Sequence, residues 1–209
     1  MTDPALASLA DFANMVGVDP NTLNAGSVNF ALAVASDAVR SYCNWPISYR
    51  SADAVQLNGY GMPKLFLPTR LLLTVRSVQL DFTPLQPVVW DGTTAGQYGY
   101  QVNRGGWLTR APMWIWPEGE QRITVVFDHG YWTDTMDGSA PAGVPTIPMN
   151  VVGVTCSVAA RMLDNPESVR SRRVGEEAEM YDGAALTAIQ LSPGDMAALK
   201  SVYHAPGPY

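Results

Sequence analysis

Cysteine and histidine are both scarce in this sequence, with two residues of each among 209. Cys43 and Cys156 fall in predicted helices and match no metal-ligand spacing, which favours buried thiols and leaves a disulfide as the alternative. No apolar run reaches the roughly 18 residues that a membrane-spanning helix needs. The first residues, MTDPALASLADF, lack the charged segment of a secretory signal. These absences predict a soluble protein that folds in a cytoplasm and holds no metal or cofactor.

The usual patterns of catalytic sites are also missing. Asp128 and His129 form the only acid–histidine dipeptide, but neighbours on a strand point to opposite faces, so we expect His129 to be a polar anchor. The glycines of Gly59–Gly61 precede no helix that could complete a phosphate-binding loop, and no GxSxG elbow occurs. We therefore predict no catalytic residue, and a hydrolase using Asp128 and His129 is the least favoured hypothesis. Other carboxylates form pairs in polar contexts typical of solvated side chains: Glu118/Glu120 and Glu176/Glu177.

Basic residues are absent from the first 39 positions, which hold four aspartates, and residues 174–209 contain five acids and only Lys200. Twelve of the thirteen basic residues lie between Arg40 and Arg173, where they face ten acids. The formal net charge of −6 argues against a nucleic-acid binder by net charge.

Hydrophobic residues recur at helical spacing in four segments. The strongest lies within residues 145–173, where Thr146 is the expected cap, Pro148 falls in the first turn, and Asn165–Pro166 ends a largely apolar helix. We expect this buried helix to be the element around which the other segments pack. The other helices are predicted at 4–16 with Asp3 as cap, at 27–43 with Ser27 as cap, and from a capping box at Ser192–Asp195 to about Tyr203.

Between residues 47 and 132 the hydrophobic period changes to two, which is typical of strands. Strands are predicted at 51–57, 65–68, 75–80 and 121–128, separated by glycines and prolines. The sequence thus predicts an α+β fold, in which a small bundle of three to four helices carries an inserted antiparallel β subdomain. The expected parts are an N-terminal helical pair (1–46), the β insert (47–132), a linker with the central helix (133–173), and an acidic arm, short helix and tail (174–209).

Two residue clusters outside the predicted helices are candidates for binding. Four tryptophans in or beside the β insert have three interpretations: core packing is favoured, an inter-subunit surface comes second, and a sugar-stacking platform third. These residues are Trp107, Trp114, Trp116 and Trp132. The basic cluster of Arg170, Arg172 and Arg173 is most simply a solvated helix exit with local salt bridges. A contact with phosphate in a channel, or with another subunit, is its alternative.

Several segments, taken in order, resemble the head–tail adaptor (connector) proteins of long-tailed bacteriophages, particularly those that infect actinobacteria. Their order along the chain, more than any single motif, carries the resemblance. The expanded stretches Val88–Trp116 and Thr133–Gly143 depart from it. The segments are LADFANMVG, AVRSYCNWPI, LFLPTRLLLTVRSVQLDFTPL, NRGGWLTR, ITVVFDHGYW, VPTIPMNVVGVTCSVAARMLDNPESVRSRRVGEEAEMYD and LSPGDMAALKSVY.

This resemblance implies a structural virion protein, made in the host cytoplasm, with no catalysis. It implies a homo-oligomeric ring, typically a dodecamer, seated beneath the portal protein at the junction of capsid and tail. A head–tail stopper or tail terminator protein would bind its other side, and double-stranded DNA would pass non-specifically through the central hole. The acidic ends and the more basic middle would suit a ring in which unlike faces of neighbouring subunits meet.

The C-terminal segment resembles the part of these adaptors that docks on the portal. Its prolines exclude regular structure, so it would become ordered on docking. The residues concerned are Tyr203, His204, Pro206, Pro208 and Tyr209. The alternative function is a carbohydrate- or surface-binding β module of a virion that uses the tryptophan cluster.

Overall fold

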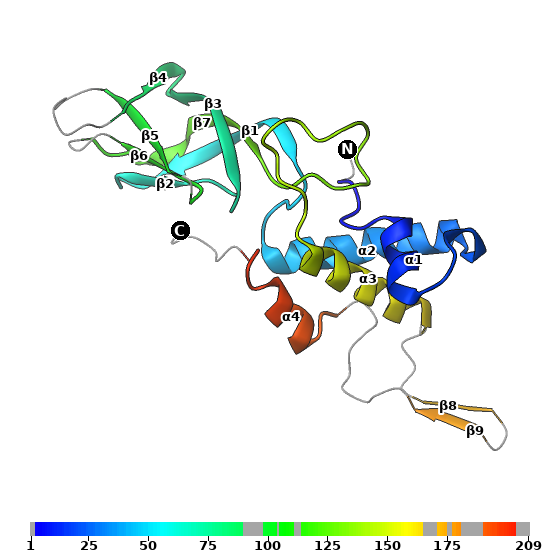
Figure 1. The fold of residues 1–209 in the computed structure, drawn as a ribbon. Helices are drawn as coiled ribbons and strands as arrows, with labels where there is room; N and C mark the ends of the chain where they lie inside the picture. Colours follow the sequence, from blue (N-terminus) through cyan, green and yellow to red (C-terminus); the bar gives the residue numbers. More distant parts are fainter. Residues whose placement is uncertain are drawn as a thin grey trace. The chain divides into compact units, whose positions relative to one another are not determined.

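A computed structural model describes residues 3–89, 98–103, 105–110, 114–164, 171–174, 177–180 and 190–203, with 171–174 and 177–180 described by their backbone. The chain divides into two compact units. The helical unit comprises Met1–Asn44, Trp132–Ala140 and Thr146–Tyr203, and the β unit comprises Trp45–Tyr131 and Pro141–Pro145. The predicted α+β class is confirmed, with four α-helices and a seven-stranded sheet among the described residues (Figure 1).

The helical unit contains α1 (Leu9–Val16), a 3₁₀ turn (Pro20–Thr22), α2 (Ala25–Cys43), α3 (Met149–Asp164) and α4 (Pro193–Leu199). The predicted buried helix is α3, which contacts all three other α-helices. Its valines and alanines at Val151, Val158 and Ala159 are fully buried, because the apolar face extends around most of the helix. Both cysteines of the chain are buried free thiols, and burial raises the pKa of Cys156 to about 12. None of the described helices has the length and apolar character of a membrane span.

Three predicted helix starts differ from the structure. Helix α1 begins after Ser8, whose hydroxyl and Asp11 form a capping box, and not after Asp3. The preceding residues Leu6 and Ala7 are instead buried in a non-helical segment, where the Leu6 amide bonds to Ser36 of α2. Helix α2 is capped by Asn24 and not by Ser27, which lies three residues later. Helix α3 starts at Met149, so Thr146 does not cap it. The capping box that opens α4 at Ser192 is confirmed.

The β unit holds seven strands: β1 (Arg50–Gly59), β2 (Lys64–Phe66), β3 (Leu72–Leu80), β4 (Thr83–Pro87), β5 (Gly99–Asn103), β6 (Trp107–Arg110) and β7 (Gly119–His129). Their order in the sheet is β1-β7-β3-β4-β5-β6-β2. The expectation of a purely antiparallel sheet is wrong at one point, because β4 and β5 pair in parallel through Gln86–Gly99 and Pro87–Tyr100. All other neighbours in this sheet are antiparallel.

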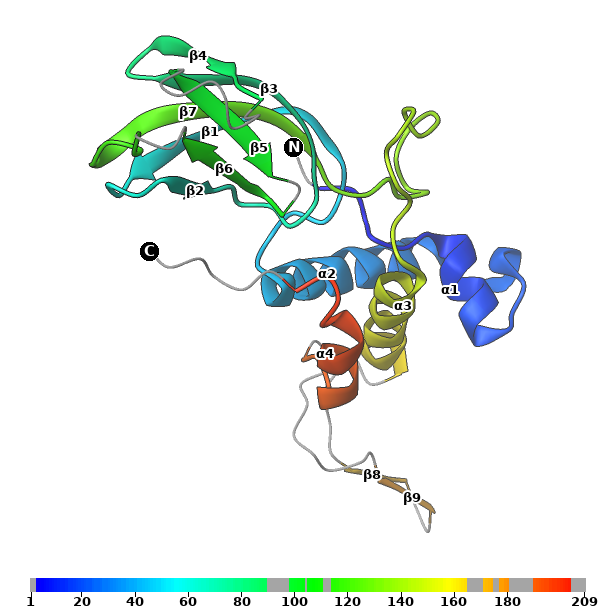
Figure 2. The same cartoon turned by 60° about the vertical axis from the view of Figure 1, so that its left-hand side comes forward.

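The sheet curls almost into a barrel (Figure 2). Its first and last strands, β1 and β2, are joined by only Tyr60–Pro63, a connection that spans at most about 17 Å. The outer strands of a flat seven-stranded sheet would lie roughly 29 Å apart. Curling encloses a core in which Leu108, Ile123 and Phe127 are completely buried.

The chain segments that lead into and out of the β unit lie side by side. The Tyr131 amide donates to the Ile47 carbonyl at 2.8 Å, and the Tyr49 amide donates to the Tyr131 carbonyl at 2.7 Å. Gly130 has φ +90°, and a Cβ at this position would lie 2.4 Å from the Ser48 carbonyl oxygen, so only glycine fits.

A separate antiparallel hairpin follows α3 in the sequence and comprises β8 (Ser171–Val174) and β9 (Glu177–Met180). The acidic arm expected at the start of the segment 174–209 contains β9 among the residues that the structure describes. Arg172 is paired with Glu179 and Arg173 with Ala178 in the register.

Candidate functional site

His129 is a buried polar anchor and does not pair with its neighbour in sequence. Its ring is 1% exposed, and Nε2 lies 3.0 Å from Asp53 Oδ2 on β1. Burial lowers the pKa of His129, although the Asp53 carboxylate acts in the opposite direction. Nδ1 has no hydrogen-bond partner among the described residues. A buried imidazole with a lowered pKa is neutral at pH 7 and holds β1 against β7.

Asp128 faces the other side of the sheet, as the strand alternation predicts. It accepts hydrogen bonds from Arg76 Nε at 2.7 Å, from Arg76 Nη2 at 3.0 Å, and from the Ala52 amide at 2.7 Å. Burial alone would raise the pKa of Asp128, but these bonds outweigh it and the pKa is lowered. The two side chains therefore serve separate structural contacts. Within the described residues, no group of three His, Cys, Asp or Glu side chains is placed to bind a metal.

The four predicted tryptophans occupy different environments. Trp116 is 1% exposed and belongs to the β-unit core, whereas Trp114, two residues earlier, is 41% exposed. Trp107 on β6 is partly buried, with its ring 6.3 Å from that of Phe66 and 5.8 Å from Lys64 Nζ. Trp132 is partly buried and lies in the helical unit, where its carbonyl accepts from the Ile147 amide at 2.8 Å. An inter-subunit role for this set stays a prediction.

A cluster that the sequence analysis did not identify surrounds Arg110, the last residue of β6. The guanidinium carbon lies 4.5 Å from the ring centre of Tyr98, 5.3 Å from that of Trp116 and 5.9 Å from that of Trp114. Arg110 is only 2% exposed because it occupies an inward-facing position of the strand, two residues after the buried Leu108. We call these four side chains the Arg110 cluster. Its rings come from residues that precede and follow β6 in the sequence. A local sequence pattern therefore does not predict the cluster.

The predicted arginine cluster and C-terminal docking segment are described only in part. Arg172 and Arg173 lie on β8, and Arg170 is outside the described residues. Tyr203 follows α4 and its ring lies 5.3 Å from that of Tyr42 on α2. His204, Pro206, Pro208 and Tyr209 are outside the described residues. The channel and portal roles of these residues stay predictions.

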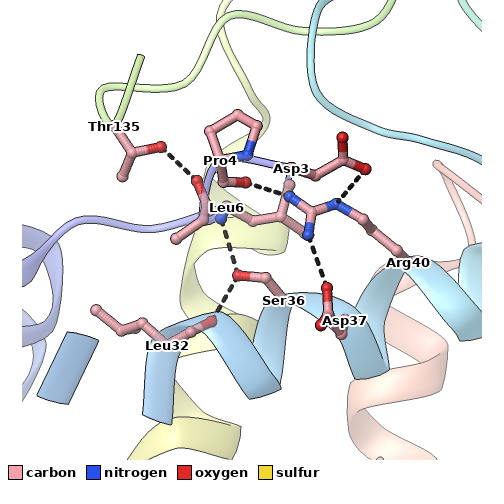
Figure 3. A network of polar contacts seen from close by, with 9 residues as sticks. Asp3, Pro4, Leu6, Leu32, Ser36, Asp37, Arg40 and Thr135 are labelled. Atoms are coloured by element: carbon pink, nitrogen blue, oxygen red, sulfur yellow. Dashed lines mark hydrogen bonds and ion pairs between the residues drawn. The ribbon is translucent and has the colours of Figure 1, made fainter. Parts of the chain in front are cut away.

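In the helical unit, polar contacts fasten the N-terminal segment to α2 (Figure 3). The Leu6 amide donates to Ser36 Oγ at 2.9 Å, and Ser36 Oγ donates to the Leu32 carbonyl at 2.6 Å. Arg40 contacts the Pro4 carbonyl, Asp37 at 3.1 Å and Asp3 at 3.9 Å. A second segment joins through Thr135 Oγ1, which donates to the Ala5 carbonyl at 2.5 Å. These bonds fix the non-helical segment that precedes α1.

Comparison with known proteins identifies similar folds in solved structures only. No family model and no curated protein matches the sequence. A chain in the neck of a native gene transfer agent (GTA) particle, computed with C12 symmetry, matches 100% of this chain and 99% of its own length, with a TM-score of 0.53 and 16% identity. A chain of the virion of a native GTA particle matches 97% of this chain and 93% of its own, with a TM-score of 0.57 and 15% identity. A chain in the neck of an empty GTA particle, computed with C6 symmetry, covers the same shares with a TM-score of 0.53 and 14% identity. At these identities the comparison establishes a shared fold.

Proposed function

We propose that this protein is a structural component of a virion neck, which joins the capsid to the tail in a phage-like particle. The observation that carries the proposal is the fold match along the whole chain to a protein in the neck of a gene transfer agent. The match covers 100% of this chain and 99% of the gene transfer agent chain, so it includes both the helices and the β unit. The order of the segments that resemble phage head–tail adaptors supports the same role independently.

In this role the protein forms a ring of identical subunits, a dodecamer, seated beneath the portal. The C12 symmetry of one matched neck supports this number. A head–tail stopper or tail terminator protein binds the opposite side, and double-stranded DNA passes through the hole. The negative net charge suits such a channel, because tight phosphate contacts would impede sliding DNA. In this role the protein is a structural connector and does not catalyse a reaction.

Assembly with the cognate portal protein tests this proposal. Native mass spectrometry and electron microscopy of the two proteins together should give a closed ring of this chain on the portal. A chain that stays monomeric with the portal under these conditions would refute the proposal.

Deletion of residues 204–209 should weaken the attachment to the portal and leave the unfolding midpoint of the subunit unchanged. Equal attachment by the shortened protein would remove the docking role of this segment.

The carbohydrate-binding alternative retains one supporting observation, the 41% exposure of Trp114. It is weaker, because Trp116 belongs to the core and Trp107 is partly buried against neighbouring side chains. Glycan binding that disappears in a folded Trp114→Ala variant would favour it over the neck role.

A further inference from the structure

The Arg110 cluster holds a positive charge that has no negative partner among the described residues. The Arg110 side chain makes no hydrogen bond or ion pair with any described residue, and its buried Nε and Nη1 both lack acceptors. Two other arginines of the β unit differ from Arg110 in this respect. Arg76 and Arg122 each bind an aspartate through Nε and Nη2. A buried charge without a partner is unfavourable, so Arg110 calls for an acceptor that the described residues do not supply.

The surroundings of Arg110 stabilise a cation and supply further donors. Three aromatic rings lie within 6 Å of the guanidinium carbon, a distance at which the negative face of a ring attracts a cation. The indole Nε1 of Trp116 is also buried without a hydrogen-bond partner. The cluster therefore contains unpaired donors on two side chains, and the described residues place no acceptor on either.

Two of the rings of the cluster are exposed to solvent. Tyr98 is 48% exposed and Trp114 is 41% exposed, and their rings meet edge to face with centres 5.1 Å apart. These two rings form a rim above a guanidinium that is itself only 2% exposed. A ligand that approaches from solvent would meet these two exposed rings first, and the buried donors of Arg110 and Trp116 lie behind them.

We propose that the Arg110 cluster is a receptor for a carboxylate side chain presented by another protein chain. Arginine binds carboxylates through charge-assisted hydrogen bonds, which are strongest where water is excluded. The site would neutralise its buried charge only when the partner is in place. This inference goes beyond the proposed neck role and holds for any protein neighbour.

The geometry favours a carboxylate over a DNA phosphate. Residues that bind the phosphate backbone of DNA are typically exposed lysines and arginines that form a basic surface. Arg110 is a single recessed cation in a chain of net charge −6, and aromatic rims of this kind are typical of protein interfaces. An acidic side chain on an apolar surface fits both the rim and the donors.

The binding test uses the full chain and NMR signals of the Arg110 Nε–H and the Trp116 indole N–H. The probes are the capped peptide acetyl-Gly-Glu-Gly-amide, its neutral glutamine counterpart, inorganic phosphate and a 20-base-pair DNA duplex, all at equal ionic strength. We expect saturable shifts of both signals with the glutamate peptide and none with the glutamine peptide. The same shifts on raising the protein concentration alone would identify a second copy of this chain as the source of the carboxylate. Equal responses to both peptides, or a response to phosphate and DNA alone, would overturn the proposal.

A stability comparison separates a binding role from a structural one. Arg110→Met should abolish the response of the Trp116 signal to the glutamate peptide while the thermal unfolding midpoint stays the same or rises, because a buried unpaired charge is removed. Arg122→Met is the matched control in the same unit. It should retain the peptide response and lower the midpoint, because Arg122 bonds to Asp81 Oδ1 at 2.8 Å. A fall in the midpoint of Arg110→Met as large as that of the control would show that Arg110 serves the fold, and would refute the receptor.

Discussion

At the scale of single residues, His129 links the fold to pH. Burial holds the folded-state pKa of His129 below its ordinary value near 6.5, so the unfolded chain takes up this proton first as the pH falls. Its contribution to stability is therefore complete above about pH 6.5 and is lost as the pH falls toward the folded-state pKa.

We expect the free energy of unfolding to decrease between pH 7 and pH 5 in the native chain, and to decrease less in His129→Gln. Urea denaturation at several pH values measures this slope. His204→Gln, which changes the only other histidine, is the matched control and should keep the native slope. Identical slopes for the native chain and His129→Gln would contradict the prediction.

The residue scale also marks the limit of sequence reasoning. The alternation rule correctly separates Asp128 from His129, because it follows from strand geometry alone. It cannot reveal that His129 contacts Asp53, which lies 76 positions away and reaches it only through the β1–β7 pairing. Arg110 is less predictable still, since an arginine on a short strand is ordinarily exposed.

At the scale of elements, the contact between the N-terminal segment and α2 depends on Ser36. Ser36→Ala would leave the buried Leu6 amide without its acceptor, at a cost of about 1–3 kcal/mol. Chemical denaturation should show this loss as a lower midpoint with an unchanged slope. Ser41→Ala, at an exposed position on the same helix, should change stability by no more than about 0.5 kcal/mol. Equal effects of the two substitutions would exclude a special role for this bond.

Glycine in the middle of α3 offers a stabilising change. Gly153 is exposed, and a Cβ added there would meet nothing within 4 Å. Gly153→Ala should therefore stabilise the isolated chain by about 0.5–1 kcal/mol, because alanine loses less backbone entropy in a helix. The contrasting variant is Gly130→Ala, which should destabilise the chain because the new methyl group meets the Ser48 carbonyl. Thermal denaturation of both variants checks the two opposite signs.

Strong periodicity accounts for the elements that the sequence predicted. Helices α2, α3 and α4 and strands β1, β3 and β7 have long or well-capped patterns, and each was expected at nearly its observed place. Strands β4 and β5 are not predicted separately, because Pro84, Pro87 and Gly99 resemble turn residues in sequence. Strand β6 is missed because its four residues are too few for a clear period. The start of α1 was misplaced because the bond from Leu6 to Ser36 joins residues 30 positions apart.

At the scale of the whole molecule, the β8–β9 hairpin offers a test of assembly. The substitutions Arg172→Glu and Arg173→Glu together should impair ring formation or DNA retention, with little change in the unfolding midpoint of the subunit. Native mass spectrometry and thermal denaturation measure the two effects. A large loss of subunit stability would instead assign these arginines to the fold.

The register of the hairpin supplies a sharper control. Arg172 is paired with Glu179, so Arg172→Glu combined with Glu179→Arg restores opposite charges on the two strands. We expect assembly to stay impaired in this double variant, because the role proposed for Arg172 is a contact with another chain or with DNA. Full recovery by the exchange would mean that a local cross-strand pair explains the effect.

The backbone bonds that Tyr131 makes to Ile47 and Tyr49 have an evolutionary consequence. They bring the two ends of the segment Trp45–Tyr131 of the β unit to one point, so a chain that carries this segment needs only a small gap to accommodate it. Genetic recombination at these two positions can therefore replace one β unit with another while the helices keep their pairing. Related chains would then diverge fastest in the β unit, and the helices would preserve the older record of descent.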